Sequence, residues 1–449
     1  MNKITKNNKF IFIIFICNKI IMKYSDIFVI LPHQLYEIKY LIKTYNYVIY
    51  EHPHYFESYN YNKKKLILHR GSMIYYYNYL KKNNINVQYI KFNEKFDISK
   101  YILFDPIDKI NLKGKYMFVN SPNFLLTFEL CEKYRNKTKK FFFNAFYMWS
   151  KKELNIIPNI KSQDKENRNK LPKEINIPKI SNNDYDKKYI DLGKKFVCKY
   201  FNNNYGNIHN FIFPLTHLTA KKWLKYFIKY KIYNFGTYQD SISENNNTIF
   251  HSLLSTSINI GLLQPKDIIN EILQYKNIPL NSLEGFIRQL FWREYQRYCY
   301  IYCDFNNKNY FNNNIKLNNK WYDGTIGILP VDNCIKNAFD TGYLHHIERL
   351  MIMGNFMNLS GIHPDEGFKW FMEFSCDSYL WVMHQNVYDM VFFVTGGKTM
   401  RRPYISSSNY ILKMSDYKKD NWCIEWNNLY KKFVNKNKKK LLKFGYYFR

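Results

Sequence analysis

A polar segment divides the chain into two parts with different patterns. Between Lys151 and Lys188 charged and polar residues dominate, three prolines occur, and large apolar side chains are few. This composition is typical of an interdomain linker. A chain of 449 residues can form two or three domains, each with its own core. Residues 151–190 are therefore predicted to join two domains of different class.

The first part alternates between strand-like and helix-like segments. Strands are expected at 26–31, 87–92 and 115–119, and helices at 73–82 and after residue 122. This alternation predicts a doubly wound parallel sheet over residues 26–150. Ligands of such sheets bind at the carboxyl ends of the strands, which places Gln34 in a binding position. No glycine-rich phosphate loop follows Gln34, which argues against an ordinary dinucleotide enzyme.

The second part has helical periodicity almost throughout. Apolar residues recur three and four positions apart in residues 218–230 and 283–302. The predicted fold class is thus an α/β domain followed by an all-helical domain at 191–430. Residues 431–449 are expected to be a solvated basic tail.

Residues 1–25 are predicted to lie outside the fold as a leader. They begin with basic residues and continue with an apolar run from Phe10 to Cys17, which is too short to span a bilayer. Direction to an organelle by this leader is an open hypothesis. The eight cysteines include no C-x-x-C pair, so free thiols in a reducing compartment are expected, inside the cell in the cytoplasm or nucleus.

The net charge of +31 points to a polyanionic partner. Lys and Arg number 67 against 36 Asp and Glu, and such an excess attracts nucleic acid. An AT-rich coding sequence would also inflate lysine, and an anionic membrane surface would offer the same attraction. Charge alone therefore supports nucleic acid only modestly.

Two stretches of the helical part place polar side chains in apolar surroundings. Residues 250–263 carry four hydroxyls and Asn259 at an expected helix start, where hydroxyls and backbone N–H groups can bind phosphate. One serine would suffice for ordinary capping. Residues 285–297 form an apolar helix interrupted by charged residues and Gln289, and buried charge must be paired or face a ligand.

Two further stretches carry histidines, glycines and arginines. His345 and His346 are adjacent in the segment 342–358, about 100° apart around a helix, so at least one is expected to face a cleft. Imidazole can transfer protons near neutral pH. On this string alone, a helix with structural histidines is the simpler interpretation. Residues 370–410 contain Gly396–Gly397, which permits close approach of the backbone to a ligand. They also contain Arg401 and Arg402, whose guanidinium groups can bind phosphate.

Taken together, these strings resemble one family. ILPHQLYE, FHSLLSTSINIGLL, EGFIRQLFWREYQR, GYLHHIERLMIMGNFMNL, YLWVMHQNVYDM and RRPYISSSNYILKMSDY occur in order over roughly residues 26–430. They are similar to the bacterial-type branch of the photolyase and cryptochrome superfamily, the deoxyribodipyrimidine photolyase-related proteins. So many ordered strings are more specific than any one of them.

The resemblance implies an antenna-type N-terminal domain and a helical domain that binds FAD. Its implied site residues fall into four groups: His345 and His346 between flavin and lesion; Ser252, Ser255, Asn259, Gln289, Arg293 and Asn386 as FAD contacts; Trp370, Trp321 and Tyr322 as electron carriers; and Arg401 and Arg402 on DNA. His384 replaces a residue of the family pattern and would add a histidine close to the flavin.

The function that the resemblance implies is light-driven, FAD-dependent repair of UV-damaged DNA. Repair of a (6-4) lesion needs a proton donor as well as an electron, so the two histidines favour (6-4) lesions over cyclobutane dimers. A cryptochrome-like photoreceptor without repair activity is the main alternative, and the short segment after Tyr430 favours repair. A flavin-free DNA-binding remnant is the third interpretation. A monomer with no membrane association is expected.

The resemblance also bears on an antenna pigment and an iron–sulfur cluster. Relatives suggest a ribityl-lumazine antenna, but deazaflavin, folate or no pigment would fit Gln34 and His69 equally well. Many relatives hold an iron–sulfur cluster on four cysteines, including a C-x-x-C after the segment matching KMSDY. Here residues 418–421 hold no cysteine, and only Cys334 and Cys423 lie near ligand positions. Since a cluster needs four thiolates, it is predicted to be absent, and no metal is expected.

Overall fold

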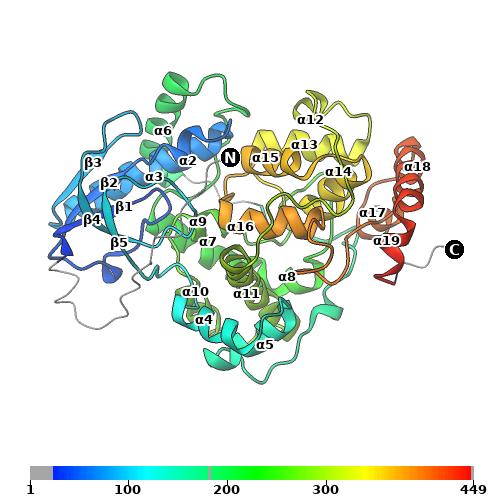
Figure 1. Ribbon diagram of the computed structural model, residues 1–449, viewed down its shortest axis with the longest axis horizontal. Coiled ribbons are helices and arrows are strands. Elements are labelled where there is room, and N and C mark those ends of the chain that lie inside the picture. Colours follow the sequence, from blue (N-terminus) through cyan, green and yellow to red (C-terminus); the bar gives the residue numbers. More distant parts are fainter. Residues whose placement is uncertain (1–23, 180–183, 446–449) are drawn as a thin grey trace.

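Five parallel strands form a single sheet at one end of the molecule (Figure 1). The computed structural model describes residues 24–179 and 184–445. The strands are β1 (Ile27–Ile30), β2 (Asn46–Tyr50), β3 (Val87–Ile90), β4 (Lys100–Phe104) and β5 (Lys115–Val119). Their order is β3-β2-β1-β4-β5, and β1 pairs with β2 through Val29↔Val48 and with β4 through Val29↔Leu103. The predicted parallel sheet is confirmed, while β2 and β4 were not predicted.

The two faces of the sheet pack differently. One face joins the main core, which also includes helix α3 (Lys63–Lys82). The other face carries a smaller cluster around Val29, Val48 and Tyr50. Phe96 and other residues from the connecting segments 91–99 and 105–114 close this second cluster. Both faces of the central strands are therefore buried, which explains the continuous apolar run of β1.

Helix α3 begins ten residues earlier than the sequence pattern predicted. The Asn62 side chain accepts a hydrogen bond from the Lys64 N–H and caps the helix. The first turns contain buried lysines, which conceal the apolar pattern. Lys65 Nζ donates to the Ser378 carbonyl at 2.6 Å and to Ser378 Oγ at 2.9 Å. This contact joins the start of α3 to the helical part of the chain.

Helices make up the rest of the fold. Before residue 217 the helical elements other than α3 are η1 (Ile38–Tyr40), α2 (His54–Glu57), α4 (Phe128–Lys137), α5 (Phe143–Glu153), η2 (Asp164–Glu166), η3 (Asp184–Asp186) and α6 (Lys187–Tyr200). The larger helical part contains α7 (His217–Tyr230), α8 (Ile232–Tyr238), α9 (Ser255–Asn259), α10 (Pro265–Ile272), α11 (Leu280–Tyr302), α12 (Lys320–Asp323), α13 (Leu329–Thr341), η4 (Glu348–Gly354), α14 (Asn355–Leu359), α15 (Pro364–Phe374), α16 (Leu380–Met383), η5 (His384–Val391), α17 (Asn409–Met414), α18 (Asn421–Lys436) and α19 (Lys438–Leu442). The predicted fold class, α/β followed by all-α, is confirmed.

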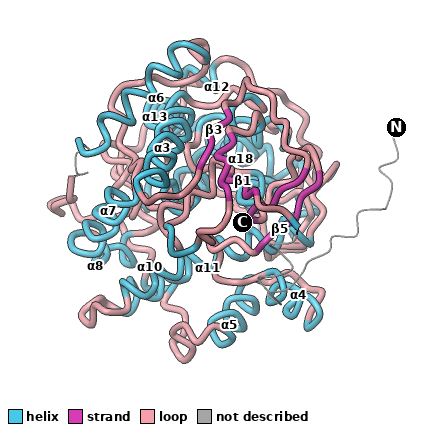
Figure 2. Tube along the Cα trace, turned by 90° about the vertical axis from the view of Figure 1, so that its left-hand side faces the viewer, coloured by secondary structure: helices cyan, strands magenta, loops and turns pink. Residues whose placement is uncertain are grey.

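The boundary between the two parts is crossed by side chains and by packed helices. Helix α6 lies along α3, as the side view shows (Figure 2). On α11, the Glu294 carboxylate accepts the backbone N–H groups of Leu125 and Leu126. The domain limits inferred from sequence stay predictions, and so does the leader, most of which lies outside the described residues. Within residues 24–179 and 184–445, no helix combines the length and apolar character that crossing a membrane requires.

Candidate functional site

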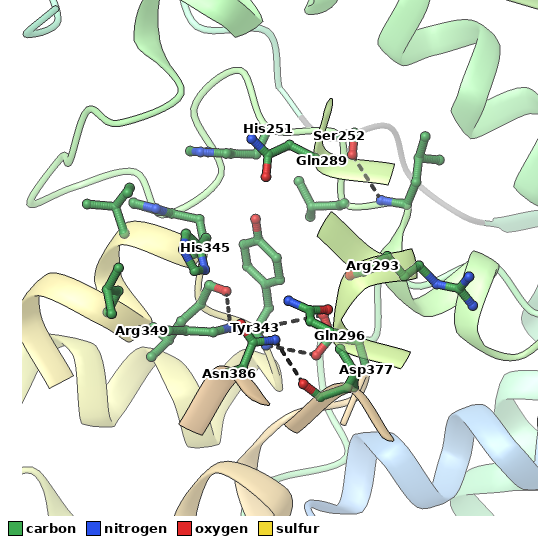
Figure 3. A pocket seen from close by; sticks show the side chains of 18 of the residues that line it. His251, Ser252, Gln289, Arg293, Gln296, Tyr343, His345, Arg349, Asp377 and Asn386 are labelled. Atoms are coloured by element: carbon green, nitrogen blue, oxygen red, sulfur yellow. Dashed lines mark hydrogen bonds and ion pairs between the residues drawn. The ribbon is translucent and has the colours of Figure 1, made fainter. Parts of the chain in front are cut away.

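A cavity opens in the middle of the helical part (Figure 3). Its volume is about 280 Å³, and the hollow with its open mouth measures about 1380 Å³. The wall includes all eight residues that the sequence assigned to catalysis and cofactor binding: His345, His346, Ser252, Ser255, Asn259, Gln289, Arg293 and Asn386. These residues span more than 130 positions of the chain, so the fold brings them together.

The polar wall is built from α9, α11 and the loop before α9. Asn259 Nδ2 donates to the Asp377 carbonyl at 2.8 Å, and Arg293 Nε donates to Asn259 Oδ1 at 3.0 Å. Arg293 also donates to the Asn123 carbonyl at 2.6 Å, while its third nitrogen, NH2, is buried without a partner. A buried donor of this kind is suited to an anionic group.

Helix α9 differs from the expected helix start. It contains only five residues, Ser255–Asn259, so it offers one short turn rather than a long aligned helix. Ser252 and Ser255 line the cavity, but Thr256 and Ser257 do not. The cavity-facing hydroxyls, rather than a helix dipole, are the feature of this stretch that could bind a ligand.

The histidine segment is not one continuous α-helix. Helix α13 ends at Thr341, Gly342 has φ +70°, and the helix resumes only at His346, after which η4 is a π-helix. A side-chain carboxyl oxygen of Glu348 accepts the His345 backbone N–H at 3.0 Å and so caps this second start. His345 is buried, whereas the exposed surface of His346 faces the cavity that it lines. At least one histidine was expected to face a cleft, and both line the cavity. The two do not lie on one helix, because the helix resumes only at His346.

A third imidazole, which the sequence analysis missed, lies against the pair. His251 stacks on His345 with ring centroids 4.4 Å apart and planes inclined by 12°. Burial lowers the pKa of His251 and of His346 to about 4 and that of His345 well below its usual value, and the neighbouring charges lower these pKa values further. All three rings are therefore neutral near pH 7 before a ligand binds. The sequence signal that could have identified His251 was its place directly before Ser252 in the string FHSLLS.

An ion pair at the edge of the cavity was also missed. Arg349 NH1 and NH2 lie 2.9 and 3.3 Å from the two Asp377 carboxylate oxygens, a two-point contact. Burial alone would raise the pKa of Asp377, but the Arg349 charge and the hydrogen bonds from Arg349 and Ser375 outweigh it, so the pKa is lowered. The pair fixes the position of a positive and a negative group beside the histidines. Asp377 gave no motif signal of its own.

Glu348 should make the folded protein sensitive to pH. Burial raises its pKa from 4.5 to about 8, so the carboxyl group is protonated in the folded state near neutral pH. A raised folded-state pKa contributes stability that is complete below about 4.5 and is lost as pH rises through about 8. We expect Glu348→Gln to abolish this loss, measured as thermal midpoints of both proteins across pH 4.5 to 8.5. Equal slopes for the two proteins would contradict the prediction.

The expected electron carriers lie outside the cavity wall. Trp370 is fully buried, and its indole N–H donates to the Trp321 carbonyl at 2.7 Å. Its neighbour Phe371 lines the cavity, with ring centroids 5.2 Å from Trp370. Tyr322 donates to a Glu373 carboxylate oxygen at 3.0 Å. The three residues thus lie close together behind the wall, and their electron-transfer role stays a prediction.

Arg401, Arg402 and His384 do not reach the cavity. Both arginines are exposed, and Arg401 lies over the Phe142 ring at 4.1 Å. His384, expected close to the flavin, packs instead against the rings of Phe368 and other aromatic residues outside the wall. The DNA-binding role of the arginines stays a prediction.

The residues expected near an antenna pigment or an iron–sulfur cluster are buried in the protein. Gln34 and His69 are fully buried and hydrogen-bonded to other protein groups, including Gln34 to the Phe104 carbonyl and His69 to the Tyr379 hydroxyl. Neither lines the cavity of the helical part. Cys334 and Cys423 are buried free thiols, and the absence of an iron–sulfur cluster stays a prediction.

Sequence comparison identifies relatives of the chain. A family model described as deoxyribodipyrimidine photo-lyase-related protein matches residues 28–103 and 97–213. The (6-4) photolyase of Agrobacterium fabrum (strain C58 / ATCC 33970) is 36% identical over 298 residues, which is 62% of this chain and 58% of that protein. The chain thus spans less than two thirds of the length of this relative.

Comparison with solved structures identifies the same architecture. A bacterial class III photolyase from Agrobacterium tumefaciens aligns with a TM-score of 0.55 and 15% identity, over 94% of this chain and 90% of that one. An archaeal photolyase from Sulfolobus tokodaii, solved with two FAD molecules, aligns with a TM-score of 0.54 and 13% identity, over 92% and 99%. At these identities the likeness concerns the fold.

Proposed function

We propose that the chain, which is similar to the deoxyribodipyrimidine photo-lyase-related proteins, repairs UV-damaged DNA in a light-driven, FAD-dependent reaction. The proposed substrate is the (6-4) pyrimidine photoproduct. The observation that carries the proposal is one cavity whose wall combines the imidazole pair with the six residues expected for flavin binding.

The chemistry of the wall fits a flavin dinucleotide. The wall offers apolar contacts from residues such as Ile258, Leu290 and Met390, which suit a flat ring system. It also offers the hydroxyls of Ser252 and Ser255 and the unpartnered Arg293 nitrogen, which suit phosphate. When bound, a reduced flavin would supply the light-driven electron. Asn386, Gln289 and Arg293 are the residues that we propose to hold it.

The proposed role of His346 is to give a proton to the lesion. It lines the cavity and has an accessible surface, whereas His345, which also lines the cavity, is buried. Desolvation keeps the ring neutral in the free protein, and an anionic DNA substrate nearby would raise its pKa and favour the protonated donor. His345 and the Arg349–Asp377 ion pair line the same cavity. A cyclobutane dimer would need no such donor.

An absorption spectrum followed by a repair assay tests the proposal. The purified protein should show bound flavin and, under blue light, should convert (6-4) lesions in a defined oligonucleotide. Loss of cyclobutane dimers alone would change the substrate, and flavin without any repair would indicate a photoreceptor. Absence of flavin after expression with excess riboflavin would refute the proposal and leave a DNA-binding remnant.

DNA binding should depend steeply on salt. The chain carries a net charge of +31, and phosphate contacts by Lys and Arg release counterions. Between 50 and 200 mM salt, the affinity for a lesion-containing duplex should fall by roughly tenfold or more, measured by fluorescence anisotropy. The double variant R401A/R402A should reduce the slope of log affinity against log salt. A flat response of the native protein would contradict a basic DNA-binding surface.

A further inference from the structure

His251 occupies a backbone segment that is strained on both sides. Ile249 and Leu253 adopt φ values of +36° and +54°, which branched and bulky residues rarely adopt. Such conformations cost about 1–3 kcal/mol each and persist where the surrounding structure imposes them. Asn246 supports the turn, because its side-chain oxygen accepts the Thr248 and Ile249 N–H groups at 3.0 Å. The segment therefore presents His251 to the cavity at a conformational cost.

Protein contacts fix the His251 ring. Its Nε2 lies 3.0 Å from the Gln239 carbonyl, which can only accept, so this nitrogen carries the proton. The edge of Phe235 meets the imidazole at 90°, with centroids 6.4 Å apart. The other nitrogen, Nδ1, is buried without a partner. His251 thus has a defined tautomer and orientation before any ligand binds.

His345, by contrast, has little else to orient its ring. Both of its ring nitrogens are buried without a hydrogen-bond partner, and Nε2 is 3.6 Å from a Glu348 oxygen. The parallel ring of His251 at 4.4 Å is its stacking contact (Figure 3). The hydrogen bond to Gln239 therefore fixes the His251 ring, and the stacked His251 ring in turn orients His345.

We propose that His251 is a positioning residue for the imidazole pair: by stacking on His345 it sets how His345 and His346 meet a bound lesion. The inference rests on the proposed repair function and adds a third histidine to that site. Charged and titratable groups that face the three rings are Glu348 and Arg349 on η4, Lys231 after α7, and Asp240 after α8. Two stacked imidazoles cannot both be protonated without strong repulsion, so the His251–His345 pair holds at most one added proton.

Three variants test this role. His251→Ala removes the stack and admits water, His251→Phe keeps a flat ring without nitrogens, and His209→Ala changes an exposed histidine outside the cavity. Proton NMR of the DNA-free protein follows the titration of His345 and His346. We expect His251→Ala to raise the His345 midpoint by at least one pH unit, with no change in His209→Ala.

The repair assay supplies the second measurement. His251→Ala should lower the turnover of (6-4) DNA by tenfold or more, with flavin content and KM for DNA unchanged, and His251→Phe should recover most of the loss. Turnover and titration at native values in His251→Ala would overturn the proposal. So would a turnover loss with an unshifted titration, because that indicates a structural role only.

Folding failure and failure of the proposed function remain distinguishable. If His251→Ala does not fold, His251→Leu fills the space without a flat ring and should show the same tenfold loss. If the native protein repairs neither lesion, the proposed function fails. The titration of His345 then still decides whether His251 controls that ring.

Discussion

His346→Ala should abolish repair of (6-4) lesions while the protein keeps its flavin. His346 lines the cavity with an accessible surface, and general acid catalysis by a positioned side chain contributes about 10²–10⁴-fold. The expected loss in turnover is therefore of that order. It is measured as light-dependent conversion of a single (6-4) lesion in an oligonucleotide, with flavin content taken from the absorption spectrum of each preparation.

His363→Ala is the matched control for this experiment. His363 caps α15 and does not line the cavity, so its removal should cost some stability and leave turnover close to native. Repair of a cyclobutane dimer, if the protein has any, should survive His346→Ala, because that reaction needs no proton donor. Native turnover of the (6-4) lesion in His346→Ala would contradict a catalytic role for this histidine.

Asp377→Ala should destabilise the protein severely and weaken flavin binding. The substitution leaves the Arg349 guanidinium without its two-point partner and removes the acceptor of the Ser375 hydroxyl. Breaking one partner of a buried ion pair costs about 3–5 kcal/mol. We expect a loss of that order in the free energy of unfolding, measured by urea denaturation, and reduced flavin content after purification.

Glu94→Ala provides the control for the ion pair. Lys91 and Glu94 form an exposed pair at 2.9 Å, and such solvent-exposed pairs contribute little to stability. Its loss should therefore barely move the unfolding midpoint. The double variant R349M/D377L, which replaces both charges by apolar groups, should recover part of the stability but not the flavin. Equal stability of Asp377→Ala and native protein would refute the role assigned to the pair.

The fold was predictable where local pattern and tertiary structure agree. The apolar run of β1 and the periodic helix α11 signalled their burial directly. Strands β2 and β4 were missed although they are as long as β5, which was predicted. The start of α3 was missed because Lys64 and Lys65 are buried there, a consequence of partners that lie more than a hundred residues away.

The site was predictable only through strings with a distinctive order. His345, His346 and Asn386 were found because each belongs to such a string, and they do line one cavity. His251 and Asp377 were missed, since a single histidine or aspartate carries no spacing signal. Their importance comes from a stacked ring and a guanidinium that only the folded chain brings near. His384 was expected close to the flavin because it lies near Asn386 in the sequence. Nearness in sequence does not show where a side chain points, and His384 does not line the cavity.

The two π-helices η4 and η5 set a narrow tolerance for changes in chain length around the cavity. A π-turn holds one residue more than an α-turn, so deleting a single residue from either segment would restore ordinary winding. The helix beyond the segment would then keep its orientation, whereas the residue just after the deletion would move by about 100° around the helix axis. In η5, a deletion just before Asn386 would point this side chain away from the cavity that it now lines. Single-residue indels here should consequently be far more damaging than most substitutions.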